Sequence, residues 1–304
     1  MTLVLEQLLN GVQFGVTLFL LAAGLTLIFG IMGVINLAHG SLYMIGAYAA
    51  ALVVERTGSF LLAVPAGLLA AAAAGLLIEY LVIRRLYARN HVHQVLATFG
   101  LILFINEGAT ILFGRQPLLV TMPAALSGAV EIIPGIPYPT YRVVIIATGL
   151  LVGVALYVLV NKTRVGMLVR AGSTHREMVR ALGVDIRLLY TLVFSLGALL
   201  AGLAGLMTAP LLAVQVGMGE QILILTFVVV VIGGVGSVRG AFFGALIVGI
   251  TDTLLRAFLP GLLQQVMPIS EADALAGGLS SVGIYMVMAL VLIVKPQGLF
   301  RAQG

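Results

Sequence analysis

The chain has 304 residues, of which 61% are hydrophobic and 9% are charged, and its mean hydropathy is +1.18. Soluble globular domains carry about 45–50% apolar and about 25% charged residues, so the composition excludes that class. Cysteine is absent, which rules out disulfides, thiolate metal sites and cysteine nucleophiles. The net charge of +5 would suggest nucleic-acid binding in a soluble domain. Here the basic residues lie in short loops between apolar runs, so we expect no nucleic-acid partner.

Apolar runs follow one another along the chain, and most are about 20 residues long, enough to cross a hydrocarbon core of roughly 30 Å as a helix. They predict an all-α, polytopic helical bundle in a membrane and exclude the shorter alternating strands of a barrel. In chain order the predicted spans are 9–30, 34–54, 60–83, 94–113, 141–160, 188–209, 221–232, 240–258 and 276–294. We therefore expect one transmembrane domain over 1–304, with eight or nine spans.

Two of these runs are expected to be interrupted helices. The segment 34–54 follows the preceding run with almost no loop, and it carries the polar residues Asn36, His39 and Ser41. Irregular backbone at membrane depth is tolerated only where it is buried in protein or lines a watery cavity, so this segment is predicted to be broken or re-entrant. The run 221–232 is short for a full crossing and ends in a glycine cluster, which indicates a second interruption.

Basic residues in short loops indicate the orientation of the chain, because cytoplasmic loops are enriched in Lys and Arg. With the carboxyl terminus in the cytoplasm, 12 of the 16 basic residues lie inside: Arg84, Arg85, Arg89, Lys162, Arg164, Arg170, Arg176, Arg180, Arg187, Arg239, Lys295 and Arg301. The outside set is Arg56, Arg115, Arg142 and Arg256. Nine spans place the amino terminus outside, and eight place it inside.

Two loops are long. The outer loop, 114–140, is rich in proline, which opposes helix and favours either an ordered, turn-rich cap or a flexible lid; the alternative is a plain connector. The inner loop, 161–187, predicts a short helix that starts at Ser173 and stops at Gly183. One face of that helix is apolar and consists of Met178, Ala181 and Leu182. Such an element either tucks under the bundle or enters a groove on a partner subunit.

Polar side chains inside the spans are costly in hydrocarbon and should face the interior of the bundle or a cavity. We expect them to line a translocation pathway, and the candidates are Asn36, His39, Ser41, Tyr43 and Asn106. The alternative for Asn36 and His39 is that they hydrogen-bond neighbouring helices and hold the packing together.

Three acidic residues lie within the predicted spans. Glu107 and Asp252 are expected to be buried, and each can pair with an arginine near the outer end of its own helix, Arg115 or Arg256. Glu79, close to the inner surface, is expected to be an interfacial residue. Small residues four apart, in GVQFG from Gly11 and in GAFFG from Gly240, predict close helix packing.

The motifs of several enzyme classes are missing. The two lysines follow Asn161 and Val294, so no Gly-Lys-Ser/Thr phosphate loop exists and we expect no nucleotide hydrolysis by this chain. The four histidines offer no convincing metal-ligand set with nearby carboxylates. We therefore expect a protein that is not an enzyme and that has no metal or cofactor of its own.

Several stretches together resemble a known family. They are FGIMGVINLAHGSLYMIGAY from Phe29, the inner loop GMLVRAGSTHREMVRALGVDIRLL from Gly166, VIGGVGSVRGAFFGALIVG from Val231 and KPQGLF from Lys295. Over essentially its whole length the chain resembles the permease subunits of branched-chain amino acid ABC importers, of the type called LivH.

The resemblance implies an importer in a bacterial or archaeal cytoplasmic membrane. Its other parts would be a second, LivM-type permease, two cytoplasmic ATPase subunits that bind ATP and Mg²⁺, and an external substrate-binding protein. The solute would be a branched-chain amino acid, or urea, an amide or an organic acid. Contacts to the ATPase would come from the inner loop: Arg170, Ser173, Arg176, Glu177, Ala181, Gly183 and Val184. The match to the importer signature is partial, because Met178 and Val179 follow Glu177.

The alternative from another class is a self-sufficient secondary transporter or channel. In that case Asp252, Glu107 or His39 would relay protons, and an ion gradient would drive transport by the lone chain.

Overall fold

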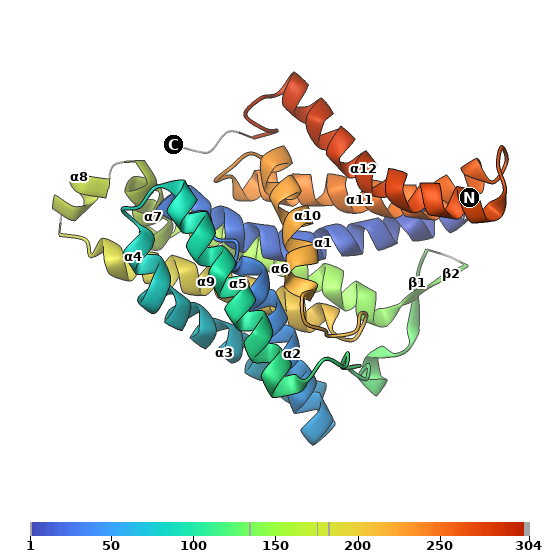
Figure 1. The fold of residues 1–304 in the computed structure, drawn as a ribbon, viewed down its shortest axis with the longest axis horizontal. Helices are drawn as coiled ribbons and strands as arrows, with labels where there is room; N and C mark the ends of the chain where they lie inside the picture. The colour runs from blue at the N-terminus through green and yellow to red at the C-terminus, as the bar shows by residue number, and fades with distance from the viewer. Residues whose placement is uncertain (1, 134, 175, 182, 301–304) are drawn as a thin grey trace.

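The computed structural model describes residues 2–133, 135–174, 176–181 and 183–300 as a bundle of helices (Figure 1). In this part of the chain, seven helical stretches are long and apolar enough to cross a membrane: α1 (Thr2–Met32), Phe60–Leu86, α5 (His91–Phe113), α6 (Thr140–Lys162), α9 (Ile186–Thr208), α11 (Val238–Leu263) and α12 (Ile269–Val294). Two further helices are α2 (His39–Thr57) and α10 (Met218–Gly233). The predicted all-α polytopic bundle is confirmed.

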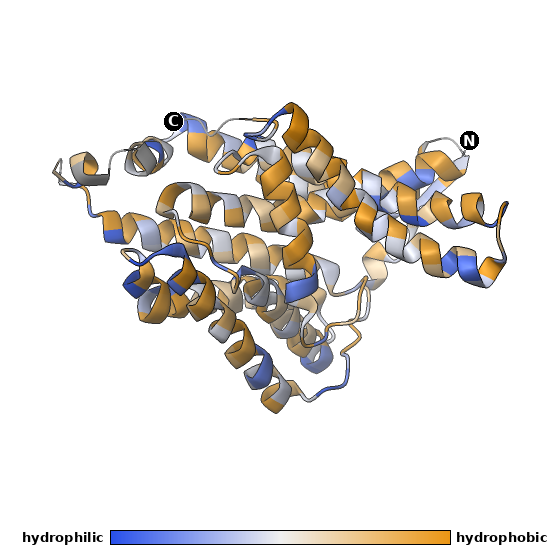
Figure 2. Cartoon of the chain, turned by 45° about the horizontal axis from the view of Figure 1, so that its top comes forward, coloured by the Kyte–Doolittle hydropathy of each residue, from blue (hydrophilic) through white to orange (hydrophobic). Residues whose placement is uncertain are grey.

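The apolar helices differ in how much of their surface is buried inside the protein. Strongly apolar residues cover most of the helical surface, and many of the hydrophilic ones lie near helix ends and in connections (Figure 2). In its most apolar window α1 is 83% buried inside the protein, whereas the corresponding windows of α5 and α12 are 11% buried. Helix α1 is therefore central, while α5 and α12 present apolar faces outward, as expected for helices that face lipid.

The elements sort to two ends of the bundle. Helices α7 (Arg164–Thr174) and α8 (Arg176–Ala181) lie at one end, on the left in Figure 1. The amino terminus and the hairpin of β1 (Ala129–Ile133) and β2 (Ile136–Pro139) lie at the other end. The outer loop is thus ordered: it holds the antiparallel hairpin and a short 3-10 turn, η2 (Ala124–Leu126).

The predicted interruption is confirmed and lies between α1 and α2. Helix α1 ends at Met32, residues 33–38 are not helical, and α2 begins at His39. The His39 Nε2 atom lies 3.2 Å from the carbonyl oxygen of Leu21, a residue in the middle third of α1. Helix α2 therefore starts inside the bundle, and from there it continues without a break to Thr57.

Close backbone approach through glycine holds α1 against α11, the largest contact between two helices in the bundle. A Cβ on Gly249 of α11 would lie 2.5 Å from the Cα of Gly15. Likewise, a Cβ on Gly240 would lie 2.0 Å from the carbonyl oxygen of Gly233 in α10. Both small-residue pairs predicted from the sequence are confirmed as packing contacts.

The carboxyl end folds back onto the connection between α10 and α11. The backbone N–H of Leu299 donates to the Ile232 carbonyl at 2.8 Å, and that of Phe300 donates to the Gly233 carbonyl at 3.0 Å. Gly298 has a left-handed φ of +80°, and a Cβ there would lie 2.6 Å from the Cα of Gly234. The motifs GGVG and KPQG, far apart in sequence, therefore form one structural unit.

Glu79, which the sequence predicts to lie near the inner membrane surface, is fully buried in the protein. It opens the short π-helical turn η1 (Glu79–Ile83) between α3 (Phe60–Ile78) and α4 (Arg84–Leu86). Its carboxylate accepts hydrogen bonds from Arg84 Nη2 at 2.8 Å, from Tyr87 Oη at 2.5 Å and from Thr191 Oγ1 at 3.1 Å. This network ties the end of α3 to α9.

We expect Glu79→Gln to lower the stability of the purified protein by about 2 kcal/mol, because the charge-assisted bonds to Arg84 and Thr191 are lost. Thermal unfolding in detergent measures this as a lower Tm. Glu107→Gln is the matched control, because Glu107 is exposed on α5. Equal Tm values for the two variants would show that the buried network does not hold α3 to α9.

We expect Gly298→Ala to lower the Tm as well, because a side chain at a left-handed φ costs about 1–2 kcal/mol and its Cβ meets the backbone of Gly234. Gly277→Ala in α12 is the control, since no atom of the described residues lies within 4 Å of a Cβ there. An unchanged Tm for Gly298→Ala would mean that the carboxyl end is not fixed in this position.

Candidate functional site

Two adjacent cavities lie at the end of the bundle where α1 and α6 begin and where α9 and α11 end. Their volumes are about 520 Å³ and about 500 Å³. They share a set of lining residues: Phe14, Tyr43, Leu212, Ile222 and Arg256. We name the pair the outer cavity.

Polar side chains from several helices face the outer cavity. Gln13 and Thr17 come from α1, and Gln13 Nε2 donates to Thr17 Oγ1 at 3.2 Å. Thr208 is at the end of α9, and Thr253 is in α11. A polar wall inside such an apolar bundle indicates a space that holds water or a polar solute.

Charged groups of both signs also line the outer cavity. The Asp252 side chain is 8% exposed and accepts a 2.8 Å bond from Arg256 Nε, whose side chain is 52% exposed. The expected pairing of Asp252 is confirmed. The expectation that Glu107 is a buried acid is wrong, because Glu107 is exposed on α5.

A second guanidinium, that of Arg142 at the start of α6, lines the same space. Arg142 Nη1 donates to Asn10 Oδ1, and the Tyr138 hydroxyl donates to the same oxygen at 3.2 Å. Burial raises the pKa of Tyr138, so this phenol stays protonated and remains a donor at neutral pH. Together with the apolar walls of Phe14 and Leu212, the cavity has the chemistry to hold a small zwitterion that carries an apolar group.

Of the predicted pathway residues, Tyr43 lines the outer cavity. Asn36, His39 and Ser41 line neither part of it and are buried where α2 begins, with exposed fractions of 0%, 0% and 3%. Each of the three has a buried polar atom without a hydrogen-bond partner among the described residues: Asn36 Nδ2, His39 Nδ1 and Ser41 Oγ. The hydrogen bond from the His39 ring to α1 agrees with the packing alternative, and a role in transport stays a prediction for these three residues.

The fifth predicted residue, Asn106 of α5, contacts the first turn of α10. Its Nδ2 donates to Glu220 Oε1 at 2.7 Å, while its Oδ1 has no hydrogen-bond partner in the part of the chain that the structure describes. The structure therefore joins Asn106 to Glu220 and not to the other predicted residues.

Sequence reasoning missed most of the polar wall. Gln13 and Thr17 lie four residues apart in the first apolar run, which is the spacing that places two side chains on one helix face. That spacing could have predicted a polar helix face in the first span. Positive-inside counting puts Arg142 and Arg256 on the outer side, and the expected ion pair puts Arg256 beside Asp252, but neither pattern shows that both guanidinium groups line a cavity.

The inner loop has two helices where the sequence predicted one. Ser173 lies in the last turn of α7 and does not start a helix, so that prediction is wrong: Thr163, which precedes α7, already receives the Gly166 N–H on its hydroxyl. The predicted stop is confirmed, because α8 ends at Ala181 and Gly183 has a φ of +83°. The side chains of Ser173, Arg176 and Glu177, and all of His175 and Leu182, lie outside the described residues.

The short helix α8 is only partly covered by the rest of the chain. Val179 is 5% exposed and faces the bundle, whereas Met178 is 61% exposed and Ala181 is also exposed. Val184, beyond Gly183, is half-buried, and Arg170 Nη1 of α7 donates to the Val160 carbonyl. Two apolar positions of the predicted face therefore point away from the bundle.

Comparison with known proteins identifies the family. A model described as the permease component of branched-chain amino acid transport systems matches residues 7–294. The branched-chain amino acid permease protein BraD of Pseudomonas aeruginosa is 28% identical, over 97% of this chain and 95% of its own. The LivH permease of Escherichia coli is 28% identical, over 97% of this chain and 94% of its own.

A probable LivH permease of Methanocaldococcus jannaschii is 29% identical over 80% of this chain and 78% of its own. No solved structure matches the chain. The family match covers almost all of the apolar helices and all the lining residues of the outer cavity. The chain belongs to the family of permease components of branched-chain amino acid transport systems.

Proposed function

We propose that this chain is a permease subunit of a binding-protein-dependent ABC importer, and that the outer cavity is the entrance of its translocation pathway. The substrate is a branched-chain amino acid or a related small solute such as urea, an amide or an organic acid. The observation that carries this proposal is a cavity with charges of both signs inside an apolar bundle. A net-neutral zwitterion with an apolar side chain needs both features.

In this proposal the structure is an outward-facing or occluded state. The outer cavity receives the solute from an external binding protein, and the closed interior around His39 blocks passage below Tyr43. The partnerless polar atoms of Asn36, His39 and Ser41 then meet water or solute when the subunits rearrange. Buried polar groups normally have partners, so a second state that supplies them is a physical reason for these atoms to be present.

The orientation follows from the positions of the basic residues. The described ones that we assign to the cytoplasm lie at the end that holds α7, α8 and the docked carboxyl end, while Arg56, Arg115, Arg142 and Arg256 lie at or near the other end. We therefore place the carboxyl terminus in the cytoplasm, in a bacterial or archaeal inner membrane. Nine crossings then put the amino terminus outside.

The energy comes from partner subunits in this proposal. Two ATPase subunits bind ATP and Mg²⁺, and a second permease of the LivM type completes the membrane part. The exposed Met178 and Ala181 of α8 supply an apolar surface for an ATPase groove. The remaining proposed coupling residues are Arg170, Ser173, Arg176, Glu177, Gly183 and Val184.

Reconstitution of the purified complex into liposomes tests the proposal. Uptake of radiolabelled leucine should require ATP at the ATPase side and binding protein at the other side. Accumulation by the lone chain under a proton gradient, without ATP, would establish the gradient-driven alternative instead.

We expect Asp252→Asn to reduce ATP-driven uptake about tenfold, because an interaction with a charged group in the cavity is worth about 1.5–3 kcal/mol. Asp273→Asn is the matched control, since Asp273 is exposed on α12 and outside the cavity. Both complexes must assemble with equal yield. Normal uptake by the Asp252 variant would remove this residue from the pathway.

We expect Met178→Ser to lower binding-protein-stimulated ATP turnover about tenfold, because it removes an apolar contact worth about 1.5–3 kcal/mol. Met167→Ser is the control, since Met167 is 55% exposed on α7. A Gly183→Ala variant, strained at a positive φ, should have a similar defect. Wild-type turnover in a fully assembled Met178 variant would argue against docking through α8.

A further inference from the structure

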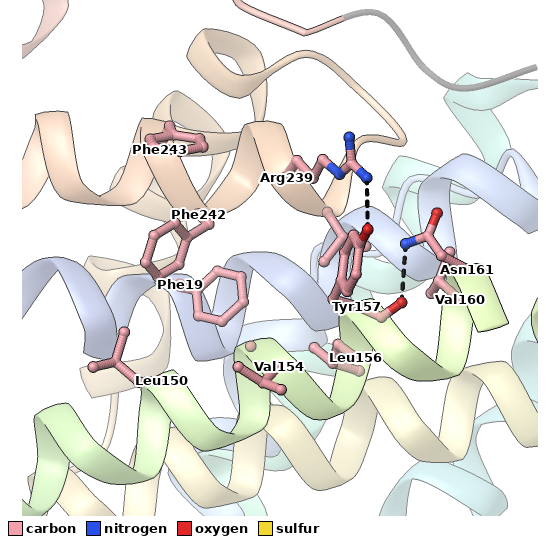
Figure 3. Close-up of a pocket in the computed structure, with 12 residues that line it drawn as sticks. Phe19, Leu150, Val154, Leu156, Tyr157, Val160, Asn161, Arg239, Phe242 and Phe243 are labelled. Atoms are coloured by element: carbon pink, nitrogen blue, oxygen red, sulfur yellow. Dashed lines mark hydrogen bonds between the residues drawn. The ribbon is translucent and has the colours of Figure 1, made fainter.

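A second, separate site lies on the outer surface of the bundle. Helices α6 and α11 lie side by side there, with α1 beneath them, and they enclose a groove of about 240 Å³ (Figure 3). Along most of its length the groove is apolar, lined by Phe19, Leu150, Val154, Phe242 and Phe243. Phe19 and Phe242 meet edge to face with ring centroids 5.2 Å apart, so the floor is firmly packed.

One end of the groove is polar. Arg239 Nη2 donates to the Tyr157 hydroxyl at 3.2 Å, and the guanidinium carbon lies 5.0 Å from the centre of that ring (Figure 3). Asn161 lies next to this pair on α6, and its Nδ2 donates to the Tyr157 carbonyl at 2.9 Å. The Arg239 guanidinium is thus held in place while its side chain stays exposed.

A further cavity of about 220 Å³ continues from this polar end. It shares Val160, Asn161, Val238 and Arg239 with the groove and extends to Arg170 of α7. Among the residues that the structure describes, no acidic side chain lines either part. The site therefore changes along its length from apolar, to aromatic and amide, to cationic.

We propose that this groove binds an anionic phospholipid, with an acyl chain in the apolar part and the phosphate beside Arg239 and Asn161. Basic pockets between transmembrane helices on the cytoplasmic side bind anionic headgroups, and a Tyr and Arg pair belongs at the membrane interface. The assignment of the leaflet rests on the orientation proposed above. The substrate pathway plays no part in it.

The geometry favours a lipid over a protein segment. The space is a narrow groove between two helices; Val154, which lines it, is 64% exposed, and Leu151 beside it on α6 is 70% exposed, as lipid-facing residues are. The order of its chemistry along the bundle matches the order of a phospholipid across one leaflet. With no acidic side chain among the described lining residues, the positive charge of Arg239 matches a headgroup of net negative charge better than a zwitterionic one, which brings its own cation beside the phosphate.

Native mass spectrometry of the intact complex tests the proposal, after incorporation into nanodiscs of phosphatidylglycerol or of phosphatidylcholine. The wild type should retain phosphatidylglycerol after detergent release. Arg239→Gln should retain about fivefold less, the change that corresponds to about 1 kcal/mol per basic residue near a headgroup. Arg85→Gln is the matched control, because Arg85 is exposed at the same end and lies outside the groove.

A second variant tests the apolar part. Val154→Trp should fill the groove and also reduce the retention of phosphatidylglycerol, with unchanged assembly and an unchanged Tm in phosphatidylcholine.

Equal retention of both lipids by the wild type, or equal loss of phosphatidylglycerol in the Arg239 and Arg85 variants, would overturn the proposal. Retention of inorganic phosphate in place of the lipid would also overturn it, because the site would then bind an anion without an acyl chain. Cross-linking of position 154 to the second permease would also overturn it, because the groove would then be a subunit interface.

Discussion

The constraint on which this structure depends is the need to satisfy irregular backbone inside an apolar bundle. Residues 33–38 leave the helical hydrogen-bond ladder next to α1, where unpaired N–H groups are costly. Side chains supply the partners: Gln94 accepts from the Ile35 N–H at 3.2 Å, and Asn36 Oδ1 accepts from the Ala38 N–H at 3.1 Å. With the break held in this way, α2 begins in the middle of the bundle, and its first turns carry Tyr43 to the wall of the outer cavity.

Close packing follows from that starting point. Helix α2 has room to begin there only because Gly40 meets Gly219 of α10 backbone to backbone, with a Cβ on either lying 2.2 Å from the other's carbonyl oxygen. The same contact positions α10, whose first turn binds Asn106 through Glu220. A movement of α10 would therefore change the contacts both at the non-helical segment 33–38 and at the outer cavity. In the function we propose, such a coupling would be a physical basis for a permease that alternates between two states.

The sequence predicted the parts of the fold that depend on local pattern. The apolar runs, the interruption before His39, the stop at Gly183 and the pairing of Asp252 with Arg256 all follow from spacing and composition. Burial of Glu79, the polar wall at Gln13 and the docking of KPQG on GGVG depend on contacts between distant segments, which no local pattern encodes. Ser173 does not start a helix because α7 already begins at Arg164, after Thr163, whose hydroxyl accepts the Gly166 N–H.

Labelling of single cysteines tests the central claim most directly, because the natural chain contains none. Thr253→Cys places a thiol on the wall of the outer cavity at a half-buried position, and Ser41→Cys places one in the closed interior. With a membrane-impermeant reagent added to the external face of the resting complex, we predict rapid labelling at position 253 and protection at position 41 until ATP and the loaded binding protein drive turnover. Protection of position 253 in every state, or labelling of position 41 at rest, would contradict an outer cavity closed below Tyr43.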